Sequence, residues 1–387
     1  MRNWLLPEYI EDVLPAEAAR IEKLRRGLLD LFRAHGYQLV IPPLLEYLES
    51  LNTGAGHDLD LATFKVVDQL NGRLVGVRAD ITPQTARIDA HMLNQQGVTR
   101  LCYADSVLRT KPDGLAQTRQ PLQVGAELFG HVGIESDIEI QCLMLQALQL
   151  VGVKSVQIDL SHVGIFRSLI RRAGINPKLE LELYAGLQSK DKAVIADMLK
   201  GMDPAIKQDF LALTDLNGGA EVLQEAQSRL PQQAEIKLAL QELRRAAQQL
   251  EALGAGVSFD LAELRGYHYH SGLVFAAYAD GCAGPLALGG RYDEVGEAFG
   301  RARPATGFSL DLRGVVTALS PAELAKGILA PYGDDAVLQR RIRELRAAGE
   351  VVVVDLPGHE AHRAELNCDR VLIQKNDGWE VVPANNS

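Results

Sequence analysis

The sequence has few cysteines, and none stands where it could act with another. Only four occur in 387 residues, and no two of them form a CxxC pair. Thiols so far apart give no spacing support for a zinc site or a disulfide framework. Isolated cysteines of this kind serve as small hydrophobic residues in a reducing compartment. We therefore expect no metal, no cofactor and no disulfide.

Long apolar runs are missing as well. No stretch approaches the ~20 apolar residues that are needed to span a bilayer. The N-terminal sequence Met-Arg-Asn-Trp-Leu-Leu-Pro-Glu turns acidic before the apolar core of a signal peptide could form. These absences favour a cytoplasmic protein that has no membrane partner.

An excess of positive charge is also lacking. Forty Lys and Arg face fifty Asp and Glu, which gives a formal charge of −10. Affinity for nucleic acids rests mainly on neutralising phosphates, so an acidic chain is a poor general polyanion binder, although a local basic groove stays possible. What is present is ordinary for a globular protein, with 47% hydrophobic and 23% charged residues. The length predicts about two or three structural units.

The N-terminal region predicts a compact helix–strand unit. Ile21, Leu24 and Leu28 follow the spacing of one apolar helix face within residues 17–35. A strand over residues 37–41 follows, and Pro42 ends it because proline cannot donate to a sheet ladder. The apolar helix face must pack against something large.

Hydrophobic periodicity and turn residues divide the rest of the chain. Residues 64–80 predict two short strands around the hairpin turn Asn71-Gly72. Residues 163–254 are helical almost throughout, and we take about 175–254 as a helical insertion. A linker after about residue 320 leads to a small α/β module. Further helices are predicted at 82–94, 137–151, 309–318 and 335–348, and further strands at 101–109, 121–129, 156–160, 257–261, 273–278, 285–288, 350–355, 369–374 and 379–382.

Four short stretches combine charged or aromatic residues with glycines or strand ends, where binding sites are commonly built. They are Arg78-Ala-Asp80-Ile-Thr82-Pro, then Arg109 with Gln123-Val-Gly-Ala-Glu127, then Arg265-Gly-Tyr-His-Tyr-His270-Ser, and Leu288-Gly-Gly-Arg-Tyr-Asp293.

The second stretch predicts a ligand surface on one sheet face. Gln123, Gly125 and Glu127 alternate along a strand and therefore point to the same side. An amide and a carboxylate beside a glycine suit a small zwitterionic ligand. The alternative is the polar, solvent-facing side of an antiparallel strand.

The third and fourth stretches leave other chemistry open. His268 and His270 share one strand face and could bind a metal, but no neighbouring ligand pattern completes such a site, so a half-polar pocket is favoured. Gly289-Gly290-Arg291 lacks the ending of a phosphate loop and the GxGxxG pattern of a dinucleotide fold. We interpret it as a tight turn that carries Arg291 and Asp293.

The order of these motifs over residues 1–320 resembles the catalytic domain of a class II aminoacyl-tRNA synthetase, specifically histidyl-tRNA synthetase. The N-terminal helix–strand unit resembles motif 1, a dimerisation element, and the strands around Arg109 resemble motif 2. Residues 264–275 resemble the histidine-specific signature RGLDYY, and residues 288–293 with 307–310 resemble the GGRYD stretch and motif 3. The resemblance implies an α+β fold, with an antiparallel sheet flanked by helices, a helical insertion and a small C-terminal α/β domain at residues 321–387.

The resemblance also implies a pocket for L-histidine. Asp80, Thr82 and Gln123 would hold the ammonium end of the ligand. Arg109 and Arg265 would face its carboxylate, and Glu127 would accept a hydrogen bond from the imidazole. Tyr269 and His270 fall on the two tyrosines of the signature, so His270 is a departure from it, as is His268 at the position of its aspartate.

The nucleotide site of the synthetases is not retained. Lys111 stands where the family has a glutamate, and Gln117 stands where it has an arginine. Gly314 occupies the position of the motif 3 arginine, while Arg313 is displaced by one residue. Activation needs cations on the transferring phosphates, so their loss argues against adenylation. The acidic C-terminal segment is shorter than an anticodon-binding domain, so no tRNA is expected.

A synthetase-like chain of this kind resembles the regulatory subunits of ATP phosphoribosyltransferase. The resemblance implies a non-catalytic subunit that joins a short catalytic subunit in the first step of histidine biosynthesis and mediates feedback inhibition by L-histidine. It also implies a homodimer within a larger hetero-oligomer. Two alternatives are an active histidyl-tRNA synthetase with a shortened C-terminal domain and a synthetase-like binding protein of other function.

Overall fold

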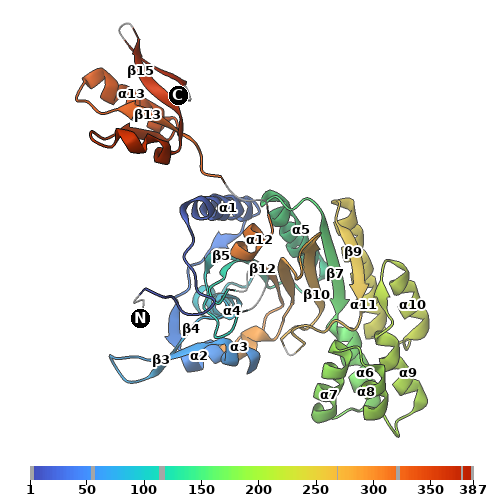
Figure 1. The fold of residues 1–387 in the computed structure, drawn as a ribbon. Coiled ribbons are helices and arrows are strands. Elements are labelled where there is room, and N and C mark those ends of the chain that lie inside the picture. Colours follow the sequence, from blue (N-terminus) through green and yellow to red (C-terminus); the bar gives the residue numbers. More distant parts are fainter. Residues whose placement is uncertain are drawn as a thin grey trace. The chain divides into compact units, whose positions relative to one another are not determined.

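The computed structural model describes residues 4–53, 57–112, 118–267, 269–319, 323–375 and 378–384. The chain divides into two compact units (Figure 1). The larger spans Met1–Asp12 and Ile21–Ser320, and the smaller spans Val13–Arg20 and Pro321–Ser387. Each unit is described by itself.

A sheet of nine strands, counted over the described residues, forms the centre of the larger unit. Most neighbours are antiparallel, while β1 with β5 and β7 with β9 are parallel. In spatial order the strands are β1 (Gln38–Leu39), β5 (Thr99–Ser106), β6 (Leu122–Phe129), β12 (Ala305–Asp311), β11 (Ala287–Arg291), β10 (Leu273–Ala279), β7 (Val156–His162), β9 (Gly256–Asp260) and β8 (Asn217–Gly218).

Helices cover the sheet (Figure 1). Helix α5 (Ile134–Leu150) contacts β6, β11 and β12, and helix α11 (Ala234–Ala252) contacts β7, β9 and β10. Both helices bury apolar residues such as Met144 and Leu243. At the N-terminal end, α1 (Pro15–Ala34) buries Ile21, Leu28 and Phe32, which confirms the apolar helix face predicted there.

Helices make up most of residues 163–252, with β8 between two of them, so a helical insertion is present. Several of these helices begin at an Asn or Asp whose side chain accepts backbone N–H groups, as Asn176 does from Lys178 and Leu179. The boundaries 175–254 remain a prediction. Before α11 the helices are α6 (Val163–Ala173), α7 (Pro177–Gln188), α8 (Lys192–Met198), α9 (Pro204–Leu213) and α10 (Glu221–Arg229).

A small antiparallel sheet is formed by residues 45–77, just before α4 in sequence. Its order is β2 (Leu45–Tyr47), β4 (Leu74–Val77), β3 (Phe64–Val67), and the predicted hairpin is present with Gly72 at a φ of +71°. Two short helices, α2 (Leu48–Asn52) and α3 (His57–Ala62), lie between β2 and β3 in sequence. The helix predicted over 82–94 begins as α4 (Thr82–Arg87) and continues as the π-helix η1 (Ile88–Leu93).

The helix predicted over 309–318 is wrong in its first part. Ser309 lies in β12, between β6 and β11, where Phe308 and Leu310 are buried. Asp311 ends this strand and caps the following helix α12 (Leu312–Thr317) by accepting the N–H of Arg313. A 3₁₀ turn, η2 (Val295–Phe299), precedes β12.

The smaller unit contains a four-stranded sheet in the order β14-β13-β15-β16, among the described residues. Ile328, Leu338, Ile342 and Leu372 form its core. The strand β13 was not predicted, because its residues follow directly on the segment interpreted as a linker. The elements are β13 (Gly327–Pro331), α13 (Ala336–Ala347), β14 (Val352–Asp355), η3 (Glu360–Leu366), β15 (Cys368–Lys375) and β16 (Gly378–Pro383).

Across the described parts of both units, we find no helix that is both long and apolar enough to cross a membrane.

Candidate functional site

A cavity of about 630 Å³ opens on one face of the nine-stranded sheet. Gln123 and Glu127 on β6 face it, together with Gly307 and Ser309, which pair with β6 from the neighbouring strand β12. Because side chains alternate along a strand, the buried residues between these positions point to the opposite face, where α5 packs. The predicted alignment of Gln123 and Glu127 on one face is confirmed.

Glu127 lies at the bottom of this cavity and is 1% exposed. Its Oε1 atom accepts hydrogen bonds from the hydroxyls of Thr82, at 3.0 Å, and Tyr103, at 2.9 Å. The hydroxyl of Tyr292 donates to Oε2. Hydroxyl groups therefore satisfy the carboxyl, and no cation is bonded to it within the described residues.

Burial raises the pKa of Glu127 to about 8. The hydroxyls of Tyr292, Tyr103 and Thr82 oppose this shift, and the nearby charge of Asp80 adds to it. The carboxyl is thus near the point where it gains or loses its proton at neutral pH. A ligand that brings an N–H donor or a positive charge would favour its ionised form.

Asp80 and Gln123 form a fixed polar pair at the beginning of α4. Asp80 Oδ1 accepts from Gln123 Nε2, at 2.8 Å, and from the backbone N–H of Thr82, at 2.9 Å. Gln123 Oε1 in turn accepts from the N–H of Ile81 at 2.9 Å. These bonds hold the Asp80 carboxylate at the cavity wall without neutralising it.

The two predicted arginines take different places. Arg109 lines the cavity, and its Nε donates to the carbonyl of Ala79 at 3.3 Å. Arg265 lines two neighbouring cavities, of about 450 and 120 Å³, and pairs with Glu263 at 3.4 Å. Residues brought together around the main cavity are Asp80, Thr82, Arg109, Gln123, Glu127, Tyr269 and His270.

Tyr269 and His270 follow a turn at Gly266, which has a φ of +66°. The ring of Tyr269 stacks on Tyr292 with centroids 5.1 Å apart, and its buried hydroxyl has no partner within the described residues. His270 Nδ1 lies 3.2 Å from the carbonyl oxygen of Arg291, and burial lowers the pKa of this imidazole to about 4. His268 lies outside the described residues.

Tyr103 and Tyr292 were not predicted as site residues. Tyr103 stands in a buried strand with no motif around it. Tyr292 lies between Arg291 and Asp293 in the Gly-Gly-Arg-Tyr-Asp stretch. The motif could therefore have indicated it, although only its two charged residues were interpreted. Since each tyrosine contacts Glu127, both belong to the candidate site.

The tight turn predicted at Gly289-Gly290-Arg291 is wrong, because these residues form β11 and pair with strands on both sides. The glycines serve close packing instead. A Cβ atom on Gly289 would collide with the carbonyl oxygen of Gly307 and with the ring of Phe275.

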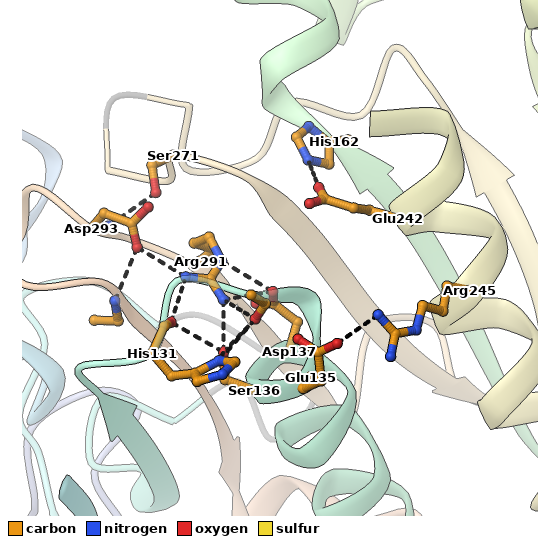
Figure 2. A network of polar contacts seen from close by, with 12 residues as sticks. His131, Glu135, Ser136, Asp137, His162, Glu242, Arg245, Ser271, Arg291 and Asp293 are labelled. Carbon is orange, nitrogen blue, oxygen red and sulfur yellow. Dashed lines mark hydrogen bonds and ion pairs between the residues drawn. The ribbon is translucent and has the colours of Figure 1, made fainter. Parts of the chain in front are cut away.

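Arg291 joins the end of β11 to the beginning of α5 (Figure 2). Its guanidinium donates to Asp137 Oδ2 at 3.0 and 2.7 Å and to Ser136 Oγ at 2.8 Å. It also donates to the carbonyl oxygens of His131 and Gly133. This buried network fixes the backbone that carries Tyr292 and accepts from His270.

Of the positions that resemble the synthetase nucleotide site, the structure describes Lys111 and Gly314, and neither is an arginine. Lys111 lines the main cavity and Gly314 lines the neighbouring 450 Å³ cavity. Arg313 instead pairs with Glu11, at 3.0 Å, and donates to the carbonyl of Gln120. Gln117 lies outside the described residues. In the described parts of the chain, no group of three or more His, Cys, Asp or Glu is arranged to hold a metal.

Fold and cavity define a histidyl-tRNA synthetase-like protein. The family model for histidyl-tRNA synthetase matches residues 9–315. A solved Bacillus halodurans structure, described as an ATP phosphoribosyltransferase regulatory subunit/histidyl-tRNA synthetase, is 29% identical with a TM-score of 0.82 and covers 96% of this chain and 98% of that one. A histidyl-tRNA synthetase from Nostoc has a TM-score of 0.78 at 19% identity, covers 96% of this chain and 92% of its own, and supports the fold alone.

The C-terminal unit and the full-length relatives narrow this class. The model for the ATP phosphoribosyltransferase subunit HisZ C-terminal domain matches residues 325–382. Relatives named ATP phosphoribosyltransferase regulatory subunit, from Methylobacillus flagellatus and Nitrosospira multiformis, are 65% and 54% identical, each over 99% of both chains. The chain belongs to the family of ATP phosphoribosyltransferase regulatory subunits. The predicted fold class and the identification as a regulatory, non-catalytic subunit are confirmed.

Proposed function

We propose that this regulatory subunit acts with a short-form ATP phosphoribosyltransferase catalytic subunit in the first step of histidine biosynthesis, and that it carries feedback inhibition by L-histidine. The names of the full-length relatives support the first part. The cavity around Glu127 supports the second. The protein would work in the cytoplasm, as a homodimer within a larger hetero-oligomer, and without tRNA.

The observation that carries the proposal is a buried acceptor, Glu127, next to the unpartnered hydroxyl of Tyr269. A neutral imidazole has one N–H donor and one nitrogen acceptor. It can donate to the Glu127 carboxylate and accept from Tyr269. A ligand that lacks either group would leave a buried partner without its hydrogen bond, so this pair discriminates strongly in favour of an imidazole.

The zwitterionic end of L-histidine needs both of its charges paired, because unpaired buried charges are costly. Asp80 and Gln123 offer acceptors for the ammonium group, and Thr82 lies beside them. Arg109 offers a cation for the carboxylate. Arg265 stands at the adjoining cavities, from which its flexible side chain would serve the same carboxylate.

We also propose that the functional division of the chain follows the two parts predicted from the sequence. Residues 1–320 would form the synthetase-like effector domain, with the helical insertion at about 175–254. Residues 321–387 would form a separate C-terminal domain. The two family-model matches, at residues 9–315 and 325–382, support a boundary between them.

The test is calorimetry of L-histidine with the wild type and with Glu127→Ala. We expect the variant to lose about 1–3 kcal/mol of binding free energy, the range for a buried group left without its partner. Glu251→Ala, on the exposed end of α11, is the control and should bind as the wild type does. In the complex with the catalytic subunit, L-histidine should inhibit the wild-type assembly, and Glu127→Ala should raise the concentration required. Coupling is reciprocal, so a complex held in its active state should bind L-histidine less tightly.

Two results would contradict the proposal. If the Glu127→Ala complex stays as sensitive to L-histidine as the wild type, the cavity is not the sensor. If the purified chain catalyses histidine-dependent ATP–pyrophosphate exchange at the rate of an ordinary synthetase, the alternative of an active histidyl-tRNA synthetase is favoured. We expect background exchange, because Gly314 leaves no arginine at the motif 3 position.

A further inference from the structure

A second, smaller cavity of about 120 Å³ lies beside the main one on the same face of the sheet. His270, Leu288 and Gly289 line both cavities and form the wall between them. The floor of the smaller cavity is apolar, with Val274 and Ala276 of β10. Of its lining residues, the synthetase resemblance assigns Arg265 and His270 to L-histidine and gives no role to Asp159 and Ser161.

Ser161 lines this cavity from β7 and is 2% exposed. Its hydroxyl has no hydrogen-bond partner in the described parts of the chain. Leaving a buried hydroxyl unpaired costs about 1–3 kcal/mol. A group that enters the cavity and bonds to Ser161 would remove this penalty.

Asp159 stands two residues earlier on β7 and so faces the same side of the sheet. Its carboxylate accepts from the hydroxyl of Ser258, but no ion pair joins it to a cation among the described residues. The other two carboxylates of the cavity are paired, Asp260 with Lys190 at 2.7 Å and Glu263 with Arg265 at 3.4 Å. The cavity therefore carries one uncompensated negative charge.

His270 brings a third polar side chain to the wall of this cavity. A carbonyl oxygen only accepts hydrogen bonds, so the contact with the Arg291 carbonyl requires the proton on Nδ1. In the neutral ring Nε2 is then an acceptor. Burial disfavours the charged ring and so keeps it neutral at neutral pH, while the contact with the Arg291 carbonyl selects the tautomer.

We propose that the smaller cavity is a binding site for a small organic cation that carries N–H donors, such as a primary ammonium, guanidinium or imidazolium group. Asp159 supplies the opposite charge, and Ser161 and His270 accept hydrogen bonds. Val274 and Ala276 contact the apolar part of the ligand. The volume suits a group of this size, since an engineered cavity of about 150 Å³ holds benzene.

The charged group of the proposed cation site is separate from that of the main cavity. Asp159 lies on β7 and lines only the smaller cavity of the two, whereas Glu127 lies on β6 and lines only the larger. A variant at either position therefore tests one proposal without the other.

The experiment titrates the full-length chain with methylammonium chloride and with guanidinium chloride at millimolar concentrations, followed by ligand-observed NMR. Tetramethylammonium chloride, which has no N–H donor, and sodium chloride at equal ionic strength are the controls. We expect saturable binding of the first two salts and none of the controls. Asp159→Asn should lower the affinity about ten-fold, as expected for a hydrogen bond to a charged group. Asp334→Asn, an exposed carboxylate of the smaller unit, should have no effect.

Two further variants keep the test independent of folding defects. Ser161→Ala removes one oxygen that has no partner, so it should preserve the fold and weaken binding several-fold. In Glu127→Ala, the part of methylammonium binding that depends on Asp159 should persist, because Glu127 does not line the smaller cavity. The proposal is overturned if binding fails to saturate, if Asp159→Asn and Ser161→Ala both bind as the wild type does, or if Glu127→Ala abolishes binding of the cation.

Discussion

The most unusual residue of the site is Glu127, a carboxyl held by hydroxyls rather than by a cation. Desolvation disfavours its charge, and the bonds from Tyr292, Tyr103 and Thr82 offset that cost only in part. Such a group responds to a ligand through its protonation state. The folded chain should therefore bind a proton at Glu127 in a pH range where the unfolded chain does not.

This difference predicts how stability changes with pH. The unfolded carboxyl loses its proton near its ordinary pKa of 4.5, whereas the folded one retains it up to about 8. The proton therefore stabilises the fold at low pH, and the stabilisation is lost as pH rises through this window. Between pH 6 and 8 the free energy of unfolding should fall by up to about 2–3 kcal/mol from this group, at about 1.4 kcal/mol per pH unit.

Urea denaturation of the wild type and Glu127→Gln at pH 6 and pH 8 measures the effect. The neutral variant has nothing to titrate at this position, so it should lose less stability over the interval. All other groups are common to both proteins and cancel in the comparison. Equal losses in the two proteins would show that Glu127 does not hold its proton in the folded state.

At the scale of elements, the junction of β11 with α5 determines the shape of the site. Arg291 and Asp137 are both almost fully buried. Two N–H groups of the guanidinium donate to one oxygen, Oδ2, of Asp137, and this contact ties a strand end to a helix start (Figure 2). Removing one partner of a buried pair leaves the other charge uncompensated. The junction should therefore be sensitive to single changes.

We expect Asp137→Ala to lower the free energy of unfolding by about 3–5 kcal/mol. The matched control is Arg245→Ala, which breaks the exposed pair between Arg245 and Glu135 drawn in the same view. An exposed pair contributes about 0–1 kcal/mol, so this control should stay near the wild type. Guanidinium denaturation checks both, and a similar small loss in the two variants would contradict the predicted role of the buried pair.

Local patterns predicted the elements whose neighbours in sequence determine their structure. The Asn71-Gly72 hairpin, the apolar face of α1 and the helix and later strands of the C-terminal unit are of this kind. The helix predicted over 309–318 failed because Ser309 lies in a strand whose partners, β6 and β11, are supplied by distant parts of the chain. β13 was missed for another reason, since its residues follow directly on the segment interpreted as a linker.

The site residues also divide into those that local sequence patterns predict and those that depend on tertiary contacts. Gln123 and Glu127 were predictable because strand periodicity places them on one face. Tyr103 was not, since its contact with Glu127 comes from the pairing of β5 with β6 rather than from any motif. Arg265 lies beside the main cavity rather than in it and pairs with Glu263, an arrangement that no sequence pattern indicates.

At the scale of the whole molecule, the N-terminal helix–strand unit predicts a homodimer. Ile41 is 77% exposed and Leu45 is 52% exposed, and β1 pairs with β5 alone among the described strands. Exposed apolar residues beside a strand edge call for a covering surface, which we expect a second copy of the chain to supply.

Light scattering of the purified chain should give about 84 kDa, twice the chain mass of 42.2 kDa. Ile41→Asp should shift this mass toward a single chain, because a charge in an apolar interface opposes association. Leu253→Asp, an exposed apolar residue at the end of α11, is the control and should remain dimeric. A wild-type mass of one chain at micromolar concentration would reject the dimer.

The order of strands in the central sheet also has a consequence for synthesis on the ribosome. β6, which carries Glu127, pairs with β12, and the bond from Leu122 N–H to Asp311 spans 189 residues. The emerging chain therefore contains Glu127 long before β12, the strand that pairs with β6, has been synthesised. The helices of residues 163–252 intervene and can form from local contacts in the meantime. Completion of the sheet must wait for the end of the larger unit, and a nascent chain arrested before β12 should present an unpaired strand edge to chaperones.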